Sequence, residues 1–392
     1  MGSNVTLVWA SFLASVIAAL GFVYLIAATI LVRRFATTEA FLAPGSTPSI
    51  TILKPLNGDE PGLLENLTSF CRQNYRGSIQ IIFGVQDSND RAIAVVEQLR
   101  KLKPAPAIDL VIETRAHGLN RKVSNLINMA QRIHHEIIVV ADSDMRVDPD
   151  YLTRIVAALD RPGVGAVSCP YYGIPAAGVW SALFALGING YFLPGALVGL
   201  ALGLTQPCFG STIALRRNTL AAIGGFAAVV DSIADDYAVG QALRAHGYTV
   251  SMLRFAVAHM CTTASAAELW GHEIRWGRTI RSIDPWGYAG SVMGYPLAWA
   301  LIASLTSITA GSLRLAMTMA ALSIAGRIVL LRQVERAFRL KAQAYWLVPL
   351  RDLFSFVVSV LSFFGNDVNW RGRSYRVEFG RGWVAQRRAH SP

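Results

Sequence analysis

Charged residues are scarce in this chain of 392 residues: Asp, Glu, Lys and Arg make up 16% of it, whereas a typical soluble domain has about a quarter. The scarcity is local, because no charged side chain occurs from Met1 to Val32 or from Pro285 to Leu313. The first run is longer than the roughly 20 apolar residues that cross a bilayer. The sequence therefore excludes a purely soluble protein and a disordered chain, and it predicts membrane helices.

Cysteine is also scarce. The four cysteines, Cys71, Cys169, Cys208 and Cys261, show no Cys-x-x-Cys spacing. This pattern excludes a disulfide scaffold, and we expect the four thiols to behave as small apolar side chains in a reducing compartment.

The N-terminal apolar run could be a cleaved signal peptide or a retained anchor. It lacks a basic segment before it, it is too long for the core of a signal peptide, and Arg33 and Arg34 follow it. Arginines directly after a span hold that end in the cytoplasm. We therefore predict an anchor over residues 1–34 with its N-terminus outside, followed by a linker over residues 35–48.

Residues 49–284 alternate between short apolar runs and amphipathic stretches, which predicts an α/β catalytic domain. Expected strands cover residues 49–53, 79–85, 108–113, 136–142 and 164–169, and expected helices cover 61–73, 91–102, 122–135 and 149–159. Repeated strand and helix units form parallel sheets with helices on both faces, and ligands bind at the carboxyl ends of their strands. The loops at those ends are the expected site.

Three of these loops are polar. The first contains Asp87, the second leads into a helix at Lys122, and the third contains Asp142 and Asp144. One acidic loop alone could be a helix cap or a solvated turn. Three such loops at one sheet edge instead indicate carboxylates that hold Mg²⁺ or Mn²⁺ on a nucleotide diphosphate, with Lys122 near the same phosphates.

Two later helical stretches carry further candidates. Asp235 and Asp236 open an amphipathic stretch, where they either favour the helix dipole or supply a general base. His272, Arg275 and Trp276 lie in a second basic stretch, which could simply rest at a membrane surface.

The order of these motifs resembles the GT-A glycosyltransferases of the family 2 and family 21 type. The matching stretches are VQDSND, DSDMRV, ADDY and HEIRW, with LKPLNG, GLNRKVSNL and WRGRSYRV beside them. The resemblance is to the ceramide glucosyltransferase group, whose last motif opens with Gln or Arg where this chain has His272. With that histidine, the chain is most similar to the hopanoid-biosynthesis glycosyltransferases of bacteria.

The resemblance implies a GT-A (Rossmann-like) domain with N-terminal and C-terminal transmembrane helices. It implies an inverting transfer from UDP-GlcNAc to the hopanoid bacteriohopanetetrol or, as the alternative, from UDP-glucose to ceramide. It also implies roles for single residues. Asp236 would be the catalytic base, and Asp142 and Asp144 would be ligands of the divalent metal. On the donor, Asp87 would contact the uracil or ribose, Lys122 and more weakly Lys54 would contact the phosphates, and Arg275 and Trp276 would close over the diphosphate, with His272 beside the acceptor.

Further apolar segments follow from the sequence. We expect residues 176–204 to form helices that dip into the membrane interface, interrupted by glycines, Asn189 and Pro194, although a buried helix pair is the alternative. Within a membrane region 285–365, we expect spans at 287–309 and 315–331, with Arg327 snorkelling to an end. Residues 345–364 contain Arg351 and Asp352, and a crossing there would place the basic tail outside; we expect a re-entrant or interfacial segment.

The charge of +11 and the membrane segments bear on partners and location. Basic residues flank the apolar segments and continue into a tail over residues 366–392, which we expect in the cytoplasm. Anionic lipid explains this pattern better than a nucleic acid does. A transporter with a nucleotide-binding domain is the alternative from another functional class, but no internal repeat is visible. We expect a multi-pass protein of the bacterial inner membrane, with its catalytic domain in the cytoplasm.

Overall fold

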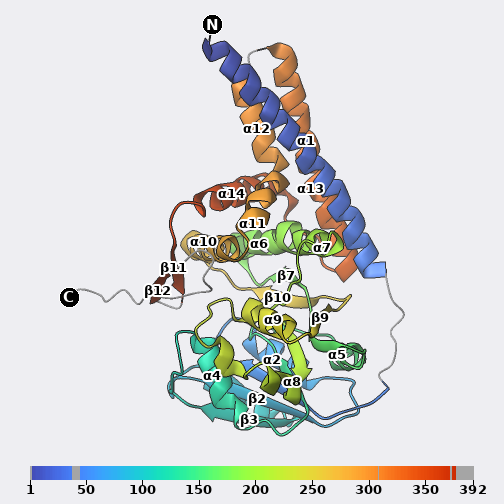
Figure 1. Cartoon of the computed structure of the whole chain (residues 1–392), viewed down its shortest axis with the longest axis vertical. Coiled ribbons are helices and arrows are strands. Elements are labelled where there is room, and N and C mark those ends of the chain that lie inside the picture. The colour runs from blue at the N-terminus through green and yellow to red at the C-terminus, as the bar shows by residue number, and fades with distance from the viewer. Residues whose placement is uncertain (1, 38–44, 308, 371–372, 377–392) are drawn as a thin grey trace, which may run out of the picture.

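The computed structural model describes residues 2–37, 45–307, 309–370 and 373–376 (Figure 1). An α/β domain lies at one end of the molecule, a bundle of long helices lies at the other, and a layer of helices lies between them. Parts of the predicted linker, 38–44, and of the predicted basic tail, 371–372 and 377–392, lie outside the described residues.

A seven-stranded sheet forms the centre of the α/β domain, in the order β3-β2-β1-β4-β8-β6-β9. Its strands are β1 (Ile50–Pro55), β2 (Ile79–Val85), β3 (Ala107–Ile112), β4 (Ile137–Val140), β6 (Val164–Ser168), β8 (Ile213–Arg216) and β9 (Thr249–Met252). The first four strands pair in parallel, whereas β8 runs antiparallel to β4 and β6. The predicted parallel-rich α/β fold is confirmed.

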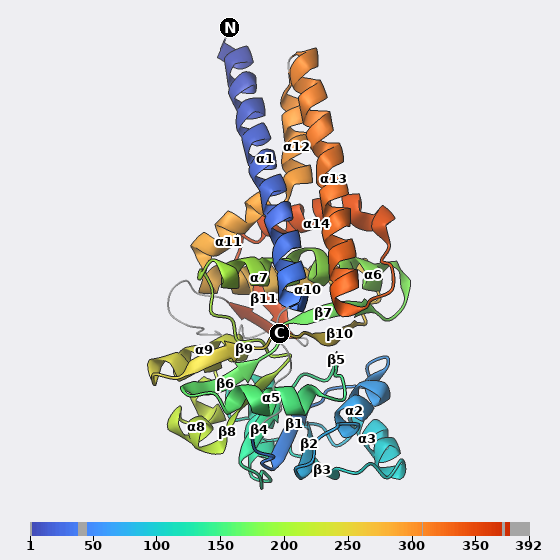
Figure 2. The same cartoon turned by 90° about the vertical axis from the view of Figure 1, so that its right-hand side faces the viewer.

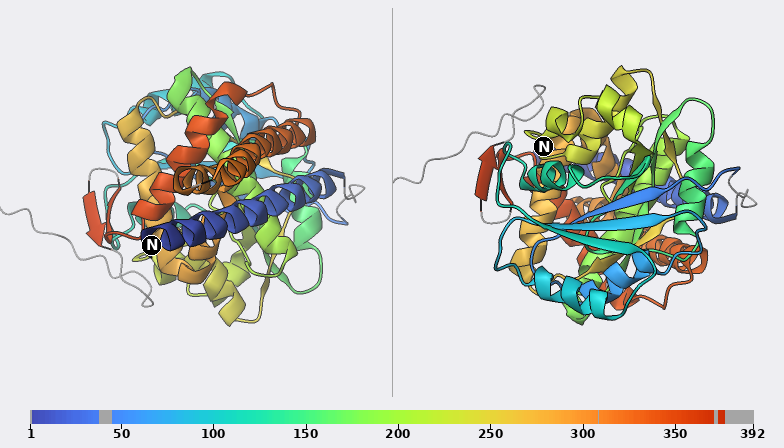
Figure 3. Two further views of the ribbon diagram at one scale, coloured as in Figure 1. Left: turned by 90° about the horizontal axis from the view of Figure 1, so that it is seen from above. Right: turned by 90° about the horizontal axis from the view of Figure 1, so that it is seen from below.

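Helices cover both faces of this sheet (Figure 3). They are α2 (Leu63–Cys71), α3 (Ala92–Lys101) and α5 (Tyr151–Leu159) on one face, and α4 (Arg121–Ala130), α8 (Arg217–Ala222) and α9 (Asp235–Ala245) on the other. Because side chains alternate along a strand, Ile52 of β1 packs in one core and Leu53 in the other. The four cysteines are buried and free, as the sequence predicts.

A second, three-stranded sheet lies between the main sheet and the helical layer (Figure 1). It contains β5 (Met145–Arg146), β7 (Tyr171–Pro175) and β10 (Val257–Cys261), in the order β5-β10-β7. Because β5 begins directly after Asp144, this sheet connects the acidic loop to β10. The sequence does not predict this sheet.

The apolar segment after β7 lies across the molecule, crosswise to the bundle, in both views (Figures 1 and 2). It comprises α6 (Gly178–Gly187), a π-helical stretch (Ile188–Phe192) and α7 (Leu193–Ala201). The expected interruption is thus a π-helical stretch within a continuous helical segment. Asn189 lies in this stretch, and its side chain bonds to both the N–H and the C=O of Gly173, which ties the segment to β7.

In the described parts of the chain, three helices are long and apolar enough to cross a membrane: Val5–Ala36 within α1 (Gly2–Thr37), the crosswise Gly178–Ala201, and Gly311–Phe338 within α13 (Ala310–Phe338). They indicate a membrane protein. The predicted span 287–309 is not one straight helix, because α11 (Pro285–Ser291) and α12 (Pro296–Thr306) belong to a pair bent by 67°. Helix α14 (Val348–Leu361) is too short to cross, and it lies across the foot of the bundle (Figure 2).

Buried charges join α13, α14 and the π-helical stretch. The Arg327 side chain is 1% exposed; its Nε lies 3.2 Å from Asp352 Oδ1, and its Nη1 donates to the carbonyl of Gly190. Arg351 pairs with Glu273 of α10 (Ala266–Ile283) at 2.8 Å. The expectation that Arg327 snorkels is therefore wrong, because its partner lies on a helix 25 residues further along the chain.

Asp352→Ala is expected to lower the free energy of unfolding by about 3 to 5 kcal/mol, because it leaves the Arg327 guanidinium buried without its carboxylate. Chemical denaturation in detergent measures this loss. Glu97→Ala, which removes an exposed ion pair with Arg100, is the control and should cost less than about 1 kcal/mol. Equal stability of the two variants would contradict a structural role for the buried pair.

Candidate active site

The candidate site lies where β1 and β4 end, close to the starts of α4 and α9. Asn120 caps α4, since its side-chain oxygen accepts from the N–H of Val123 at 3.1 Å. The same side chain donates to the carbonyl of Ser232 at 2.6 Å, in the loop before α9. This double contact holds the first turns of the two helices together and so brings Lys122 close to Asp235.

Lys122 is the positive centre of the site. Its Nζ lies 2.7 Å from Asp142 Oδ1 and 3.1 Å from Asp235 Oδ2. Burial by itself lowers the pKa of Lys122, but the attraction of Asp142 and Asp235 outweighs burial and raises that pKa above its ordinary value. The ammonium group therefore stays charged and can meet the phosphates of a nucleotide.

Asp236 is held by the backbone. Its Oδ2 accepts from the N–H of Gly210 at 3.0 Å, and its Oδ1 accepts from the N–H of Tyr237 at 2.7 Å. Burial, and then the neighbouring Asp235, raises the pKa of Asp236 to about 6, although Lys122 opposes the rise. A carboxylate with this pKa is suited to accept a proton near neutral pH.

Gly210 is surrounded by the charged groups of the site. A Cβ at this position would lie 3.0 Å from Asp142 Oδ2, 3.2 Å from Lys122 Nζ and 3.6 Å from Asp236 Oδ2. Only glycine leaves this space open. The structure thus brings Lys122, Asp142 and Asp236 together around one backbone position, as the motif order implies.

Asp144 pairs with His259 of β10, a residue that the sequence analysis missed. His259 Nε2 lies 3.0 Å from Asp144 Oδ2. Burial opposes charge on both groups, but their mutual attraction raises the pKa of His259 and lowers that of Asp144. No local pattern singles out a histidine inside a buried strand, so only the pairing of β10 with β5 reveals this contact.

Lys54 holds the acidic loop through a backbone carbonyl. Its buried Nζ donates to the backbone carbonyl of Asp142 at 2.5 Å and lies 3.7 Å from the centre of the Phe70 ring. Burial lowers the pKa of Lys54 to about 7, against the attraction of Asp144 and Asp142. These contacts hold the loop, and none of them makes Lys54 a phosphate ligand.

The acidic loop has the donor set that a divalent cation needs. Asp144 Oδ1 is buried without a hydrogen-bond partner, and Asp142 contributes a second carboxylate from the same loop. In the described parts of the chain, no three His, Cys, Asp or Glu side chains gather in a metal-binding arrangement. The residues therefore fit Mg²⁺ or Mn²⁺ bound through two carboxylates and the phosphate oxygens of a substrate.

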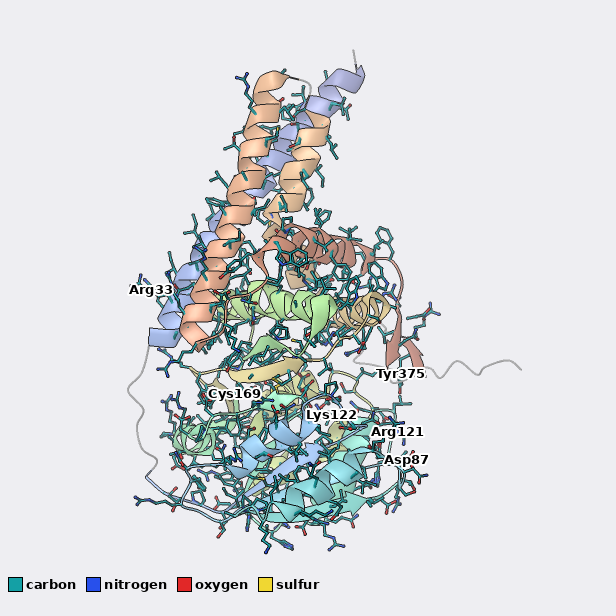
Figure 4. The ribbon with its side chains drawn as sticks, turned by 180° about the vertical axis from the view of Figure 1, so that it is seen from behind. Arg33, Asp87, Arg121, Lys122, Cys169 and Tyr375 are labelled. Carbon is teal, nitrogen blue, oxygen red and sulfur yellow. The ribbon has the colours of Figure 1, made fainter. Side chains whose placement is uncertain are left out.

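Asp87 lies at the rim of the domain, on the same side as Arg121 and Lys122 (Figure 4). It is exposed, and its Oδ1 accepts from the N–H of Asn89 in a local turn. Arg121 Nε donates to Gln86 Oε1 at 3.2 Å, which ties the start of α4 to the loop after β2. The exposed carboxylate of Asp87 is accessible to the base or ribose of a nucleotide.

The α10 motif contacts the site through aromatic side chains. The His272 ring lies 4.6 Å from both Phe184 and Trp276, and Phe184 lies 5.5 Å from His259. Burial, with Arg275 nearby, lowers the pKa of His272 well below its ordinary value, so this imidazole is neutral. The structure brings His272 and Trp276 beside the Asp144–His259 pair.

Other parts of α10 serve different purposes. Arg275 lines a separate cavity between α10 and α14. Arg278 and Arg281 donate to backbone carbonyls of residues 363–365, after α14. These two arginines hold the segment that follows α14.

Known proteins resemble this chain over most of its length. The sequence model of glycosyl transferase family 21 matches residues 13–382. Ceramide glucosyltransferase 1 of Caenorhabditis elegans is 25% identical over 201 residues, which cover 51% of this chain and 43% of that protein. Beta-monoglucosyldiacylglycerol synthase of Synechocystis sp. is 24% identical over 259 residues, which cover 64% of this chain and 52% of that protein. The matched regions span about half the length of these relatives.

A solved structure has the same fold. The mannosyltransferase PcManGT from Pyrobaculum calidifontis, in complex with GDP-Man and Mn²⁺, aligns with a TM-score of 0.51 and 19% identity, covering 91% of this chain and 99% of that chain. At this identity the likeness concerns the fold alone. Because the family model matches nearly the whole sequence, this chain belongs to glycosyl transferase family 21, and its fold is the GT-A fold.

Proposed function

We propose that the protein is a membrane-bound inverting glycosyltransferase that moves a sugar from a UDP-sugar to the hydroxyl of a lipid. The observation that carries this proposal is the convergence of Lys122, Asp142 and Asp236 around Gly210. Lys122 supplies a cation there, and Asp142 supplies a carboxylate that can bind a metal ion. Asp236 is a separate carboxylate, and its raised pKa suits a general base.

In the proposed step, Asp236 takes the proton of the acceptor hydroxyl as its oxygen attacks the anomeric carbon. The bond between that carbon and the diphosphate oxygen breaks, and the electron pair leaves with UDP. Lys122 stabilises the charge that develops on the diphosphate. A divalent cation held by Asp142 and Asp144 would supply further stabilisation of the same charge. With a single base, direct attack converts an α-linked donor into a β-glycoside.

The lipid acceptor has two lines of support. The named relatives include a ceramide glucosyltransferase and a monoglucosyldiacylglycerol synthase. The apolar helical segment Gly178–Ala201 borders the site, because Phe184 contacts His259. Within this proposal, UDP-GlcNAc and bacteriohopanetetrol are the preferred pair on sequence resemblance, and UDP-glucose and ceramide are the alternative.

We further propose that the catalytic domain faces the cytoplasm of a bacterium, at its inner membrane. Arg33 is at the end of α1 nearest the α/β domain (Figure 4), and Arg34 follows it. Basic residues at this end favour a cytoplasmic location for that end. UDP-sugars would then reach the site directly.

UDP release by the purified full-length chain tests the function. Each UDP-sugar is supplied with Mg²⁺ or Mn²⁺ and with one acceptor lipid, bacteriohopanetetrol or ceramide. We expect sustained UDP release that requires an acceptor, together with a glycolipid product by mass spectrometry. Binding of UDP-sugar without turnover on any lipid hydroxyl would overturn the proposal.

Asp144→Ala is expected to weaken UDP binding in the presence of Mn²⁺ by roughly tenfold or more, because it removes a ligand of the proposed cation. Calorimetric titration of UDP with and without Mn²⁺ measures the effect. Asp148→Ala is the matched control, since Asp148 lies four residues after Asp144, beyond β5, with an exposed side chain. An Asp144→Ala variant whose UDP affinity still rises with Mn²⁺ would remove Asp144 from the metal site.

A further inference from the structure

A cavity of about 350 Å³ lies between α10, the end of α14 and β11 (Asp367–Trp370). One wall is apolar, and the other carries charged groups. The apolar side chains are Trp270, Ile274, Leu361 and Phe364, and the charged ones include Arg275 and Arg278. A cavity of this size and mixed polarity is suited to a small head group and the first carbons attached to it.

The apolar wall opens toward the helical layer at the foot of the bundle. Trp270 and Leu361 are 38% and 39% exposed, and Phe364 is 68% exposed. On the neighbouring α11, Trp286 is 86% exposed. Exposed tryptophans beside a helical bundle are typical of the membrane–water interface, so hydrocarbon chains of a lipid could lie against this wall.

One wall of the cavity packs against two segments that lead into the candidate active site. Val368 lines the cavity, and it also packs with Ile233 and Leu119. Ile233 lies two residues before Asp235, and Leu119 lies three residues before Lys122. The strand that closes the cavity therefore contacts the two loops that carry the proposed base and the proposed phosphate contact.

The polar wall offers both donors and acceptors. Arg278 donates to the carbonyl of Phe364, yet its Nε is buried without a hydrogen-bond partner. Asp367 and Asn369 of β11 line the same wall with a carboxylate and an amide. The carboxylate and the amide can accept from the hydroxyls of a head group, and Arg278 Nε can donate to its oxygens, so this wall fits a hydroxylated head group.

We propose that this cavity, which we name the α10–β11 cleft, is the entry site through which the hydroxylated head group of the acceptor amphiphile passes from the membrane to the active site. The inference rests on the proposed lipid glycosyltransferase function. It assigns to α14 and β11 the task of receiving the hydroxylated head group of the acceptor.

Filling the cleft tests the proposal by kinetics. Leu361→Trp adds bulk at a partly exposed position, and we expect the KM for the acceptor lipid to rise at least about fivefold, with the KM for the UDP-sugar unchanged. Leu353→Trp on the same helix is the matched control, because Leu353 is 37% exposed and does not line the cleft. Equal acceptor KM values in the two variants would overturn the proposal.

Protection from labelling tests it without a bulky substitution. The four native cysteines are buried, so Leu361→Cys or Leu353→Cys introduces one accessible thiol for a water-soluble maleimide in detergent. We expect the acceptor lipid that supports turnover to slow labelling at position 361 only. Equal protection at both positions would contradict the proposal. Absence of turnover in the wild type would instead refute the proposed function itself.

Discussion

Asp236→Asn is expected to reduce turnover by about 10² to 10⁴-fold while the affinity for UDP-sugar stays within a few fold. Asparagine has nearly the same shape, and its one oxygen can accept from one of the two N–H groups, of Gly210 and Tyr237, that now bond to the two carboxylate oxygens. What it loses is the ability to take the proton of the acceptor hydroxyl. Single-turnover rates with bound UDP-sugar, together with calorimetry of UDP, separate the two quantities.

The comparison with Asp144→Ala makes this test specific. Asp144 lies on the acidic loop that carries the proposed metal ligands, so we expect its loss to act on metal-dependent donor binding. Asp236 lies on α9 and is held by the N–H groups of Gly210 and Tyr237. A variant of Asp236 with wild-type turnover would remove it as the base. A variant that lost UDP affinity and turnover to the same extent would assign Asp236 to donor binding.

The sequence predicts the main sheet because its signals are local. Apolar runs such as residues 79–85 and 137–140 form β2 and β4, and the amphipathic stretches between them form the helices. The small sheet has no such signal, since β5 has two residues and β10 is buried along its whole length. Its existence depends on a pairing between residues more than 100 positions apart, Met145 and His259.

The same distinction applies to the site. Lys122, Asp142 and Asp236 lie in motifs with a recognisable order, and the structure brings them to one point. His259 has no motif, and its role follows only from its contact with Asp144. The sequence does not predict the buried partner of Arg327. A charged side chain near the end of an apolar run can either extend to the membrane surface or pair with a buried group, and composition does not distinguish the two.

Lys122 is the cation that offsets the carboxylates near Gly210. Lys122 neutralises Asp142 and Asp235 by direct contact and also lowers the pKa of Asp236. Three carboxylates and one ammonium group leave this cluster negative without a further cation. A diphosphate, which is itself an anion, therefore binds there more tightly when Lys122 keeps its charge and a divalent cation accompanies the nucleotide.

In the wild type we expect kcat/KM to rise with pH through about 6, because Asp236 acts as a base only when deprotonated and burial raises its pKa to about 6. Lys122→Met removes the charge that opposes this rise, so the pKa of Asp236 increases further and the ascending limb moves to higher pH. We also expect UDP affinity to fall at least about tenfold, by analogy with the loss of other charged contacts to a buried anion.

The pH dependence of kcat/KM between about pH 5 and pH 9 measures the shift. Arg121→Met is the matched control, because Arg121 is the adjacent cation but bonds to Gln86 outside the acid cluster. Lys122→Arg keeps the positive charge and should keep the ascending limb near its wild-type position, even if the geometry costs some turnover. An unshifted limb in Lys122→Met would show that Lys122 does not set the pKa of the base, and the electrostatic link between the donor and acceptor sides of the site would then be wrong.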